Sequence, residues 1–263
     1  MKIVVPVKQV AVLDEEFELL EDRPGVDPDA IEWELNEWDD FSLEAALQLR
    51  EAEGDGEVVV VSVGDEEAEG GLRSCLAKGA ERALRVWGDS LEGADPLAVA
   101  RVLGAVVERE SPDLVLCGVQ SSDAVQSATG VALAAHLGLP RVAVVKALDY
   151  DAASGSVTVE RELEGGLTEM LRVKLPALLT IQTGINEPRY ANLRAIKQAK
   201  EKPLEVLEPG DLGVDDDAVA AAAGSRTRSI APPEAGAGAE MLSGSACDVA
   251  ERIADIVKER MAG

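Results

Sequence analysis

Residues 95–130 read DPLAVARVLGAVVERESPDLVLCGVQSSDAVQSATG, and this stretch contains a helical pattern, a strand pattern and a polar loop in succession. Between Asp95 and Arg109 the apolar residues recur at helical spacing and form one stripe, which predicts an amphipathic helix. Residues 113–117 follow as a short apolar run that predicts a buried strand. The helix is therefore expected to lie against a sheet.

The same alternation of strand and helix patterns extends along the first 150 residues. The 3% aromatic content leaves a core of Val, Leu, Ile and Ala, as expected of a parallel sheet buried on both faces. A further helix carries Leu43 and Leu47, and Asp39 or Asp40 could cap it. Alternating strands and helices predict an α/β fold with a doubly wound, mainly parallel sheet. Strands are expected at residues 2–8, 57–63, 82–87, 113–117 and 141–148.

The second half of the chain departs from this rhythm. Residues 157–181 hold consecutive strand patterns, including 168–174 and 177–181, so we expect an antiparallel extension there. Residues 218–240 are rich in Ala, Gly, Ser and Pro and predict an extended linker. A last helix is expected at residues 245–261, with apolar residues along one face, and it forms an arm that either covers a partner or packs back on its own domain.

The segment 184–202 is basic within an acidic chain, and its pattern favours a docking surface. Asn186-Glu187-Pro188 is typical of a turn, because Pro188 fixes its own φ and restricts the residue before it. Beyond it, Tyr190, Leu193 and Ile196 recur every three residues, and Leu193 could either face a partner or cap the local helix from inside. The basic residues of this segment are Arg189, Arg194, Lys197, Lys200 and Lys202.

Composition excludes several classes of function. The net charge of −25 argues against nucleic-acid binding, which requires a basic surface, and the acidic runs at 14–22, 27–40 and 211–217 are interpreted as solvated surface. No apolar run has the length of a membrane span and no signal peptide precedes the first strand, so we expect a cytoplasmic protein without membrane insertion. The cysteines are too widely spaced for a zinc or redox pair, so no metal site is expected and all three are interpreted as buried free thiols.

The loop at residues 118–130 is the candidate for phosphate binding. It follows the fourth strand, at the edge where ligands of open parallel sheets bind, and it enters a helix. Small and hydroxylated residues there offer backbone N–H groups and the helix dipole to a phosphate, although such a loop also commonly only caps its helix. No dinucleotide or P-loop glycine motif occurs. His136 is the single histidine and no Gly-x-Ser-x-Gly elbow accompanies it, so it is interpreted as a structural or surface residue.

Three spaced motifs resemble those of electron-transfer flavoprotein β subunits. They are Arg-Glu-Leu-Glu-Gly-Gly at 161–166, Pro-Ala-Leu-Leu-Thr at 176–180 and Asn-Glu-Pro-Arg-Tyr-Ala-Asn-Leu at 186–193. Residues 2–9, 35–42 and 117–123 resemble the opening strand and nucleotide loops of the same family. The likeness is strongest to the form that serves bacterial amine dehydrogenases.

The resemblance implies an electron carrier rather than an enzyme. Such a β subunit pairs with an α subunit that holds most of the FAD, binds AMP without turning it over, accepts electrons from a primary dehydrogenase of the amine or acyl-CoA type, and passes them to a downstream quinone oxidoreductase. It implies an adenine-nucleotide-binding, Rossmann-like domain at residues 1–205 that includes a partner-recognition loop at 184–202. Residues 206–263 would be a linker and helical arm that packs on the α subunit.

The resemblance also assigns site residues by matching motifs. Leu13 would lie near the flavin. Ser127-Ala128 replaces the amide-bearing pair of the common mammalian pattern, and the loop lacks the Asp-Gly-Asp-Thr-Ala-Gln stretch of the bifurcating branch, which favours AMP over a second flavin. The implied AMP residues are Pro6, Asn36, Val63, Gly118, Gln120, Asp123, Gln126, Ser127, Ala128 and Thr129. The implied docking residues are Arg189, Tyr190, Leu193, Ile196 and Lys197.

Two other classes of protein also combine such a sheet with such a loop. A stand-alone sensor of ATP or AMP, of the universal-stress type, would explain both but would leave residues 161–203 and the arm without a role. An ATP-pyrophosphatase-like enzyme would need a Ser-Gly-Gly loop after the first strand, where Lys8-Gln9-Val10 stands instead.

Overall fold

The computed structural model describes residues 1–13, 17–20, 24–27, 30–232, 236 and 238–261. The chain divides into two compact units, Met1–Ser229 and Ile230–Gly263. Parts of the acidic runs predicted at 14–22 and 27–40 lie outside the described residues.

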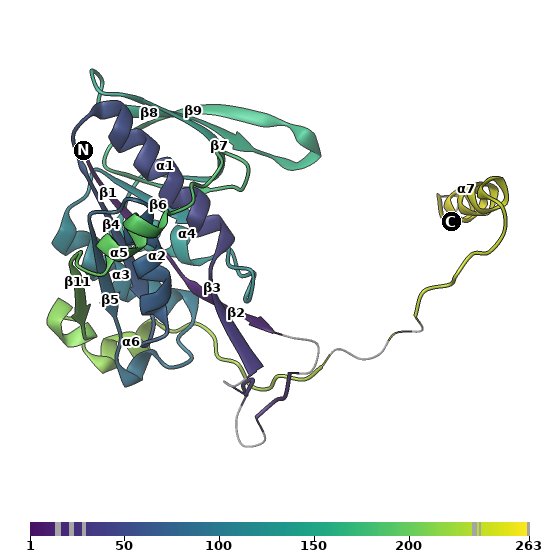
Figure 1. Ribbon diagram of the computed structural model, residues 1–263, viewed down its shortest axis with the longest axis horizontal. Coiled ribbons are helices and arrows are strands. Elements are labelled where there is room, and N and C mark those ends of the chain that lie inside the picture. Colours follow the sequence, from purple (N-terminus) through teal and green to yellow (C-terminus); the bar gives the residue numbers. More distant parts are fainter. Residues whose placement is uncertain (14–16, 21–23, 28–29, 233–235, 237, 262–263) are drawn as a thin grey trace. The chain divides into compact units, whose positions relative to one another are not determined.

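The first unit is built on a sheet that, within the described residues, has nine strands in the order β11-β5-β4-β1-β6-β10-β7-β8-β9 (Figure 1). The neighbours from β11 to β7 pair in parallel, and β8 and β9 continue the sheet as antiparallel strands. The predicted α/β, mainly parallel sheet with an antiparallel extension is therefore confirmed. The strands are β1 Lys2–Pro6, β4 Glu57–Val63, β5 Arg82–Val86, β6 Leu114–Gly118, β7 Arg141–Asp151, β8 Ser156–Glu162, β9 Thr168–Lys174, β10 Ala177–Ile181 and β11 Leu204–Leu207.

Helices cover both faces of this sheet because successive strand residues point to opposite sides. In β1, Ile3 and Val5 face one core and Val4 faces the other. The first core includes residues of α1 (Glu37–Glu53), α2 (Ala68–Lys78) and α5 (Leu193–Ala199). The second includes residues of α3 (Pro96–Glu110), α4 (Thr129–Leu137) and α6 (Asp216–Ala222). The two cores confirm the doubly wound arrangement.

One strand lies elsewhere than the sequence suggested. The expectation that residues 157–181 as a whole form the antiparallel extension is wrong for β10, which lies parallel between β6 and β7. Every residue of β10 is buried, as a strand covered on both faces requires, whereas exposed and less exposed residues alternate in β9. The extension therefore consists of β8 and β9.

Several elements were not predicted. β2 (Gln9–Leu13) and β3 (Ile31–Leu35) form a separate antiparallel pair, and β11 adds a parallel edge beside β5. The linker predicted from residue 218 is wrong for residues 218–222, which belong to α6, where Asp215 caps the helix by accepting from the Ala218 N–H at 2.7 Å. The compact unit thus extends to Ser229, past residue 205.

The second unit contains α7 (Ala246–Met261), which confirms the predicted terminal helix. No side chain of α7 is buried, although Ile253 and Val257 lie on one apolar face. Its placement on an α subunit stays a prediction.

Candidate functional site

A cavity of about 320 Å³ lies at the carboxyl ends of β1 and β6. The strand order reverses between these two strands, because β4 and β5 extend the sheet on one side and β10 and β7 on the other. Ligands of open parallel sheets bind at such a point. The volume is at the small end of the roughly 300–1,000 Å³ typical of small-molecule sites.

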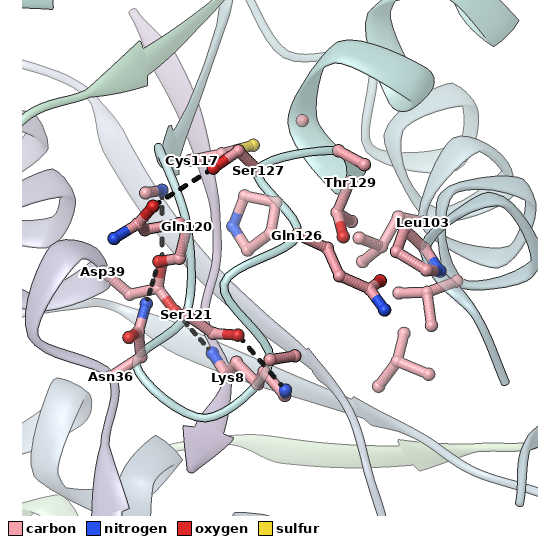
Figure 2. Close-up of a pocket in the computed structure, with 18 of the residues that line it drawn as sticks. Lys8, Asn36, Asp39, Leu103, Cys117, Gln120, Ser121, Gln126, Ser127 and Thr129 are labelled. Atoms are coloured by element: carbon pink, nitrogen blue, oxygen red, sulfur yellow. Dashed lines mark hydrogen bonds between the residues drawn. The ribbon is translucent and has the colours of Figure 1, made fainter. Parts of the chain in front are cut away.

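The cavity brings together all but one of the nucleotide-binding residues implied by the sequence (Figure 2). Pro6 and Val63 end neighbouring strands, and Asn36 precedes α1. The rest come from the loop that joins β6 to α4. The predicted residues that line the cavity are Pro6, Asn36, Val63, Gly118, Gln120, Gln126, Ser127, Ala128 and Thr129.

The backbone of this loop is strained where it passes the cavity. Val125 and Ser127 both have φ of about 50°, which side-chain-bearing residues rarely adopt, and a β-branched residue least of all. Strain of this kind persists where the surroundings enforce it, and it is concentrated at ligand sites. Thr129 begins α4 without a side-chain cap, so the first N–H groups of that helix are available to an anion.

The buried Asn36 side chain fixes the loop between β6 and α4 through two hydrogen bonds. Its side chain is 1% exposed. Its Nδ2 donates to the Gln120 carbonyl at 2.9 Å, and its Oδ1 accepts from the Ser122 N–H at 3.2 Å. Asn36 therefore binds two backbone groups of the loop, and it shapes the cavity by fixing that loop.

Asp39 joins the ends of the two strands that flank the cavity. Its carboxylate accepts from the Lys8 N–H at 2.7 Å and from the Gly118 N–H at 3.1 Å. A Cβ added at Gly118 would lie 2.4 Å from Asp39 Oδ1, so only glycine allows this approach. Burial raises the pKa of Asp39 to about 7, against the opposing effect of the two backbone donors.

Two expectations about Asp39 are wrong. It does not cap α1, because Asn36 occupies the N-cap position and Asp39 lies in the first turn. It is also 6% exposed and is not part of a solvated acidic surface. The acidic run at 27–40 therefore includes one buried carboxyl group, that of Asp39, which accepts hydrogen bonds from backbone amides.

Asp123 is the predicted nucleotide residue that does not line the cavity. Its carboxylate accepts from Lys8 Nζ at 2.7 and 2.8 Å. Burial raises the pKa of Asp123, but the hydrogen bonds from Lys8 and Ser121 outweigh it and hold the pKa below its ordinary value. Asp123 thus ties the loop to the residue that follows β1, and Lys8, which was not predicted, lines the cavity itself.

The cavity has an apolar wall that the sequence analysis missed. α3 contributes Val99 and Leu103 and the preceding turn contributes Ala94, opposite the polar loop. The apolar stripe of α3 was predicted to pack against the sheet. The spacing of the apolar residues does not show which of them lie over the middle of the sheet and which lie beside the carboxyl ends of its strands. Thr227 also lines the cavity, from a segment that composition assigned to the linker.

The predicted docking surface is strongly exposed. Tyr190 is 97%, Leu193 80% and Ile196 45% exposed. Leu193 begins α5, which Asn192 caps by accepting from the Ala195 N–H at 2.9 Å. Lys197 is exposed on the same short helix. The alternative that Leu193 caps the helix from inside is therefore wrong.

Arg189 differs from the other docking residues because it is paired within the chain. Its Nε donates to Glu44 at 2.7 Å and its Nη1 to Glu51 at 2.6 Å, both on α1. Glu44 is 5% exposed, and although its burial opposes it, hydrogen bonds from Arg189 hold its pKa below the ordinary value. Asn186 donates from Nδ2 to the Phe41 carbonyl at 3.0 Å. The loop that presents Tyr190 is thus fastened to α1.

Of the other predicted side chains, Cys117 lines the cavity and the rest do not. Leu13, expected near the flavin, ends β2 and is 40% exposed. Cys75 is a buried free thiol, as predicted, and Cys117 is buried as well but forms part of the cavity wall. Cys247 is exposed on α7, so the expectation of burial is wrong for it. His136 is exposed with Nε2 2.9 Å from Arg101 Nη1, a surface residue.

In a comparison with protein families, residues 25–212 match the electron transfer flavoprotein domain. The chain belongs to the electron transfer flavoprotein family. It is 48% identical over 261 residues to the electron transfer flavoprotein subunit beta of Methylophilus methylotrophus, with 98% of each chain covered. The match confirms the resemblance drawn from the three motifs.

More distant members of the family include the human beta subunit. It is 38% identical over 217 residues, which cover 82% of this chain and 84% of that one. The mitochondrial beta subunit of Arabidopsis thaliana is 36% identical over the same share of each chain. Within the described residues, no helix is both long enough and apolar enough to cross a membrane.

Proposed function

We propose that this chain is the β subunit of a heterodimeric electron carrier, which takes electrons from a primary dehydrogenase and passes them to a downstream acceptor. The proposal rests on the exposed docking surface of this chain, which belongs to the electron transfer flavoprotein family. Leu193 and Tyr190 expose apolar area that serves no internal packing, on a loop that Arg189 holds against α1. A held apolar side chain loses little entropy on docking and can fill a partner pocket as a hot spot.

Within that carrier, the cavity binds AMP as a structural ligand. The polar loop and the first turn of α4 suit a phosphate, and the wall of Val99 and Leu103 suits an adenine ring. A volume near 320 Å³ favours a mononucleotide over a dinucleotide. Because the ligand binds the folded state alone, it stabilises the subunit by mass action.

The redox chemistry belongs to FAD, which supplies electron transfer when bound and is held mainly by the α subunit. This chain buttresses the flavin, and Leu13 at the end of β2 is the residue assigned nearest to it. Its half-exposed side chain is free to contact a partner subunit. Of the predicted arm at residues 206–263, the part after Ser229 packs on the α subunit, since α7 exposes Ile253 and Val257 to be covered. The donor is a dehydrogenase of the amine or acyl-CoA type, and the acceptor is a quinone oxidoreductase.

Co-expression with the α subunit tests this function. A yellow complex of two chains, with a flavin absorption spectrum bleached by a donor dehydrogenase and its substrate, is the expected result. A colourless homodimer that binds ATP or AMP would refute the carrier and favour the sensor. Leu193→Ala in the same complex should slow reduction by the dehydrogenase while flavin content stays the same.

A further inference from the structure

The segment 224–229, called here the strap, is fastened to the first turn of α3 by one carboxylate. Asp95 Oδ1 caps the helix, accepting from the Leu97 and Ala98 N–H groups at 3.1 and 3.0 Å. Asp95 Oδ2 accepts from the Gly224 and Ser225 N–H groups, both at 2.8 Å, and from Ser225 Oγ at 3.1 Å. One side chain therefore makes a helix cap with one oxygen and a strap anchor with the other.

This anchor is well built for a segment of linker-like composition. Asp95 is 8% exposed, and although burial raises its pKa, hydrogen bonds from Ala98, Gly224 and Ser225 hold that pKa below the ordinary value, so it is charged and its hydrogen bonds are of the stronger kind. A Cβ added at Gly224 would stand 2.7 Å from Leu97 Cδ1, closer than van der Waals contact. The chain thus passes tightly over α3 at this point.

Three residues beyond the anchored glycine, Thr227 lines the cavity. Its side chain is exposed, and its hydroxyl has no hydrogen-bond partner anywhere in the described part of the chain. Arg226 and Arg228, on either side of it, are exposed too. The strap is anchored by three hydrogen bonds, and two residues further on it brings to the cavity a residue whose hydroxyl is unpaired, which is the geometry of a ligand contact.

We propose that the strap is part of the nucleotide site, in which Thr227 contacts the bound AMP and Asp95 is the positioning residue that holds Thr227 there. The proposal rests on the proposed AMP function and adds a contact that lies outside the β6–α4 loop. Since residue 230 follows the strap directly, bound nucleotide also fixes the point at which the C-terminal segment leaves the first unit.

Trypsin offers a direct test, because Arg226 and Arg228 flank Thr227 and are exposed cleavage sites. The full-length chain in complex with its α subunit is freed of nucleotide, and cleavage at the two sites is followed by mass spectrometry with and without AMP. AMP should slow cleavage at both sites about tenfold or more. Asp95→Asn should abolish this protection. The amide oxygen of the variant can still cap α3, but its NH₂ group then faces the N–H donors of the strap and cannot accept their hydrogen bonds. The control is Asp215→Asn, which changes the cap of α6 and should leave protection intact.

Affinity provides the second readout. Thr227→Val should raise the Kd for AMP about fivefold, the effect of one lost neutral hydrogen bond, and Thr227→Ser should restore it. Equal cleavage with and without AMP, together with an unchanged Kd in the valine variant, would overturn the strap while leaving AMP binding in place. Failure of the unmodified complex to bind AMP would instead refute the proposed nucleotide function.

Discussion

The anchoring role of Asn36 yields the most specific prediction for the cavity. Asn36→Ala removes both hydrogen bonds that this side chain makes to the β6–α4 loop, at the Gln120 carbonyl and the Ser122 N–H. The N-cap of α1 is not lost with them, because the Asn36 side chain makes no capping hydrogen bond to a backbone N–H of that helix. The effect is therefore confined to the loop, to the space left by the amide and to the carboxyl of Asp39, whose pKa is lowered by a hydrogen bond from Asn36.

The magnitude follows from the burial of each group. An unpaired buried polar group costs about 1–3 kcal/mol, whereas an exposed one finds water. Gln120 is half-buried and Ser122 is exposed, so only the first penalty applies in full. We expect the free energy of unfolding to fall by about 2 kcal/mol. AMP affinity should fall about tenfold, because the loop must then be ordered by the ligand itself, at a cost of about 1–2 kcal/mol per residue fixed.

Urea denaturation of the full-length chain and calorimetric titration with AMP measure the two effects. The matched control is Asn192→Ala, which deletes an exposed helix cap far along the chain. It should lower stability by about 1 kcal/mol and leave AMP affinity unchanged. If Asn36→Ala matched this control in both measurements, the idea that Asn36 organises the nucleotide loop would be refuted.

Three further predictions concern other sites. Leu193→Ala should change the free energy of unfolding by less than about 0.5 kcal/mol, because the side chain is exposed, yet slow electron uptake about tenfold; equal rates would reject the docking role. Burial raises the pKa of Asp39, so its contribution to stability is complete below about pH 4 and is lost as pH rises towards 7, by up to about 1.4 kcal/mol per pH unit. Asp39→Asn should remove this pH dependence from the urea midpoints between pH 4 and 7. An unaltered pH dependence would contradict the burial effect. Glu110→Gln breaks the ion pairs that the buried Glu110 makes with the half-buried Lys2 and Arg82 at the amino ends of the strands, so it should cost about 3 kcal/mol while AMP affinity stays the same, and a loss of affinity would show that the two ends of the sheet are coupled.

The sequence predicted the strands of the parallel sheet well because a buried strand shows itself as a short apolar run in its own residues. β4 is a continuous apolar run, and α3 repeats its apolar residues at helical spacing. The position of β10 could not be obtained in this way, since which strands become neighbours is decided by long-range packing. The apolar pattern of residues 177–181 predicts a buried strand but does not indicate which strands pair with it.

The cavity was partly predictable for a similar reason. The loop after β6 is marked by its small residues and by its place at a strand end, so its members were found together. Asp39 was misjudged because a single carboxylate in an acidic run carries no sign of burial, and only the fold brings the amides of Lys8 and Gly118 to it. Thr227 had no signal at all in a stretch of linker composition.

The most direct test of the whole account is the nucleotide content of the purified complex of this chain with its α subunit. Acid extraction followed by chromatography separates AMP from FAD and measures the amount of each per heterodimer. The account predicts one AMP and one FAD, with the AMP lost selectively from an Asn36→Ala complex. A complex that contains FAD but no adenylate, or that carries two FAD molecules and no AMP, would contradict it.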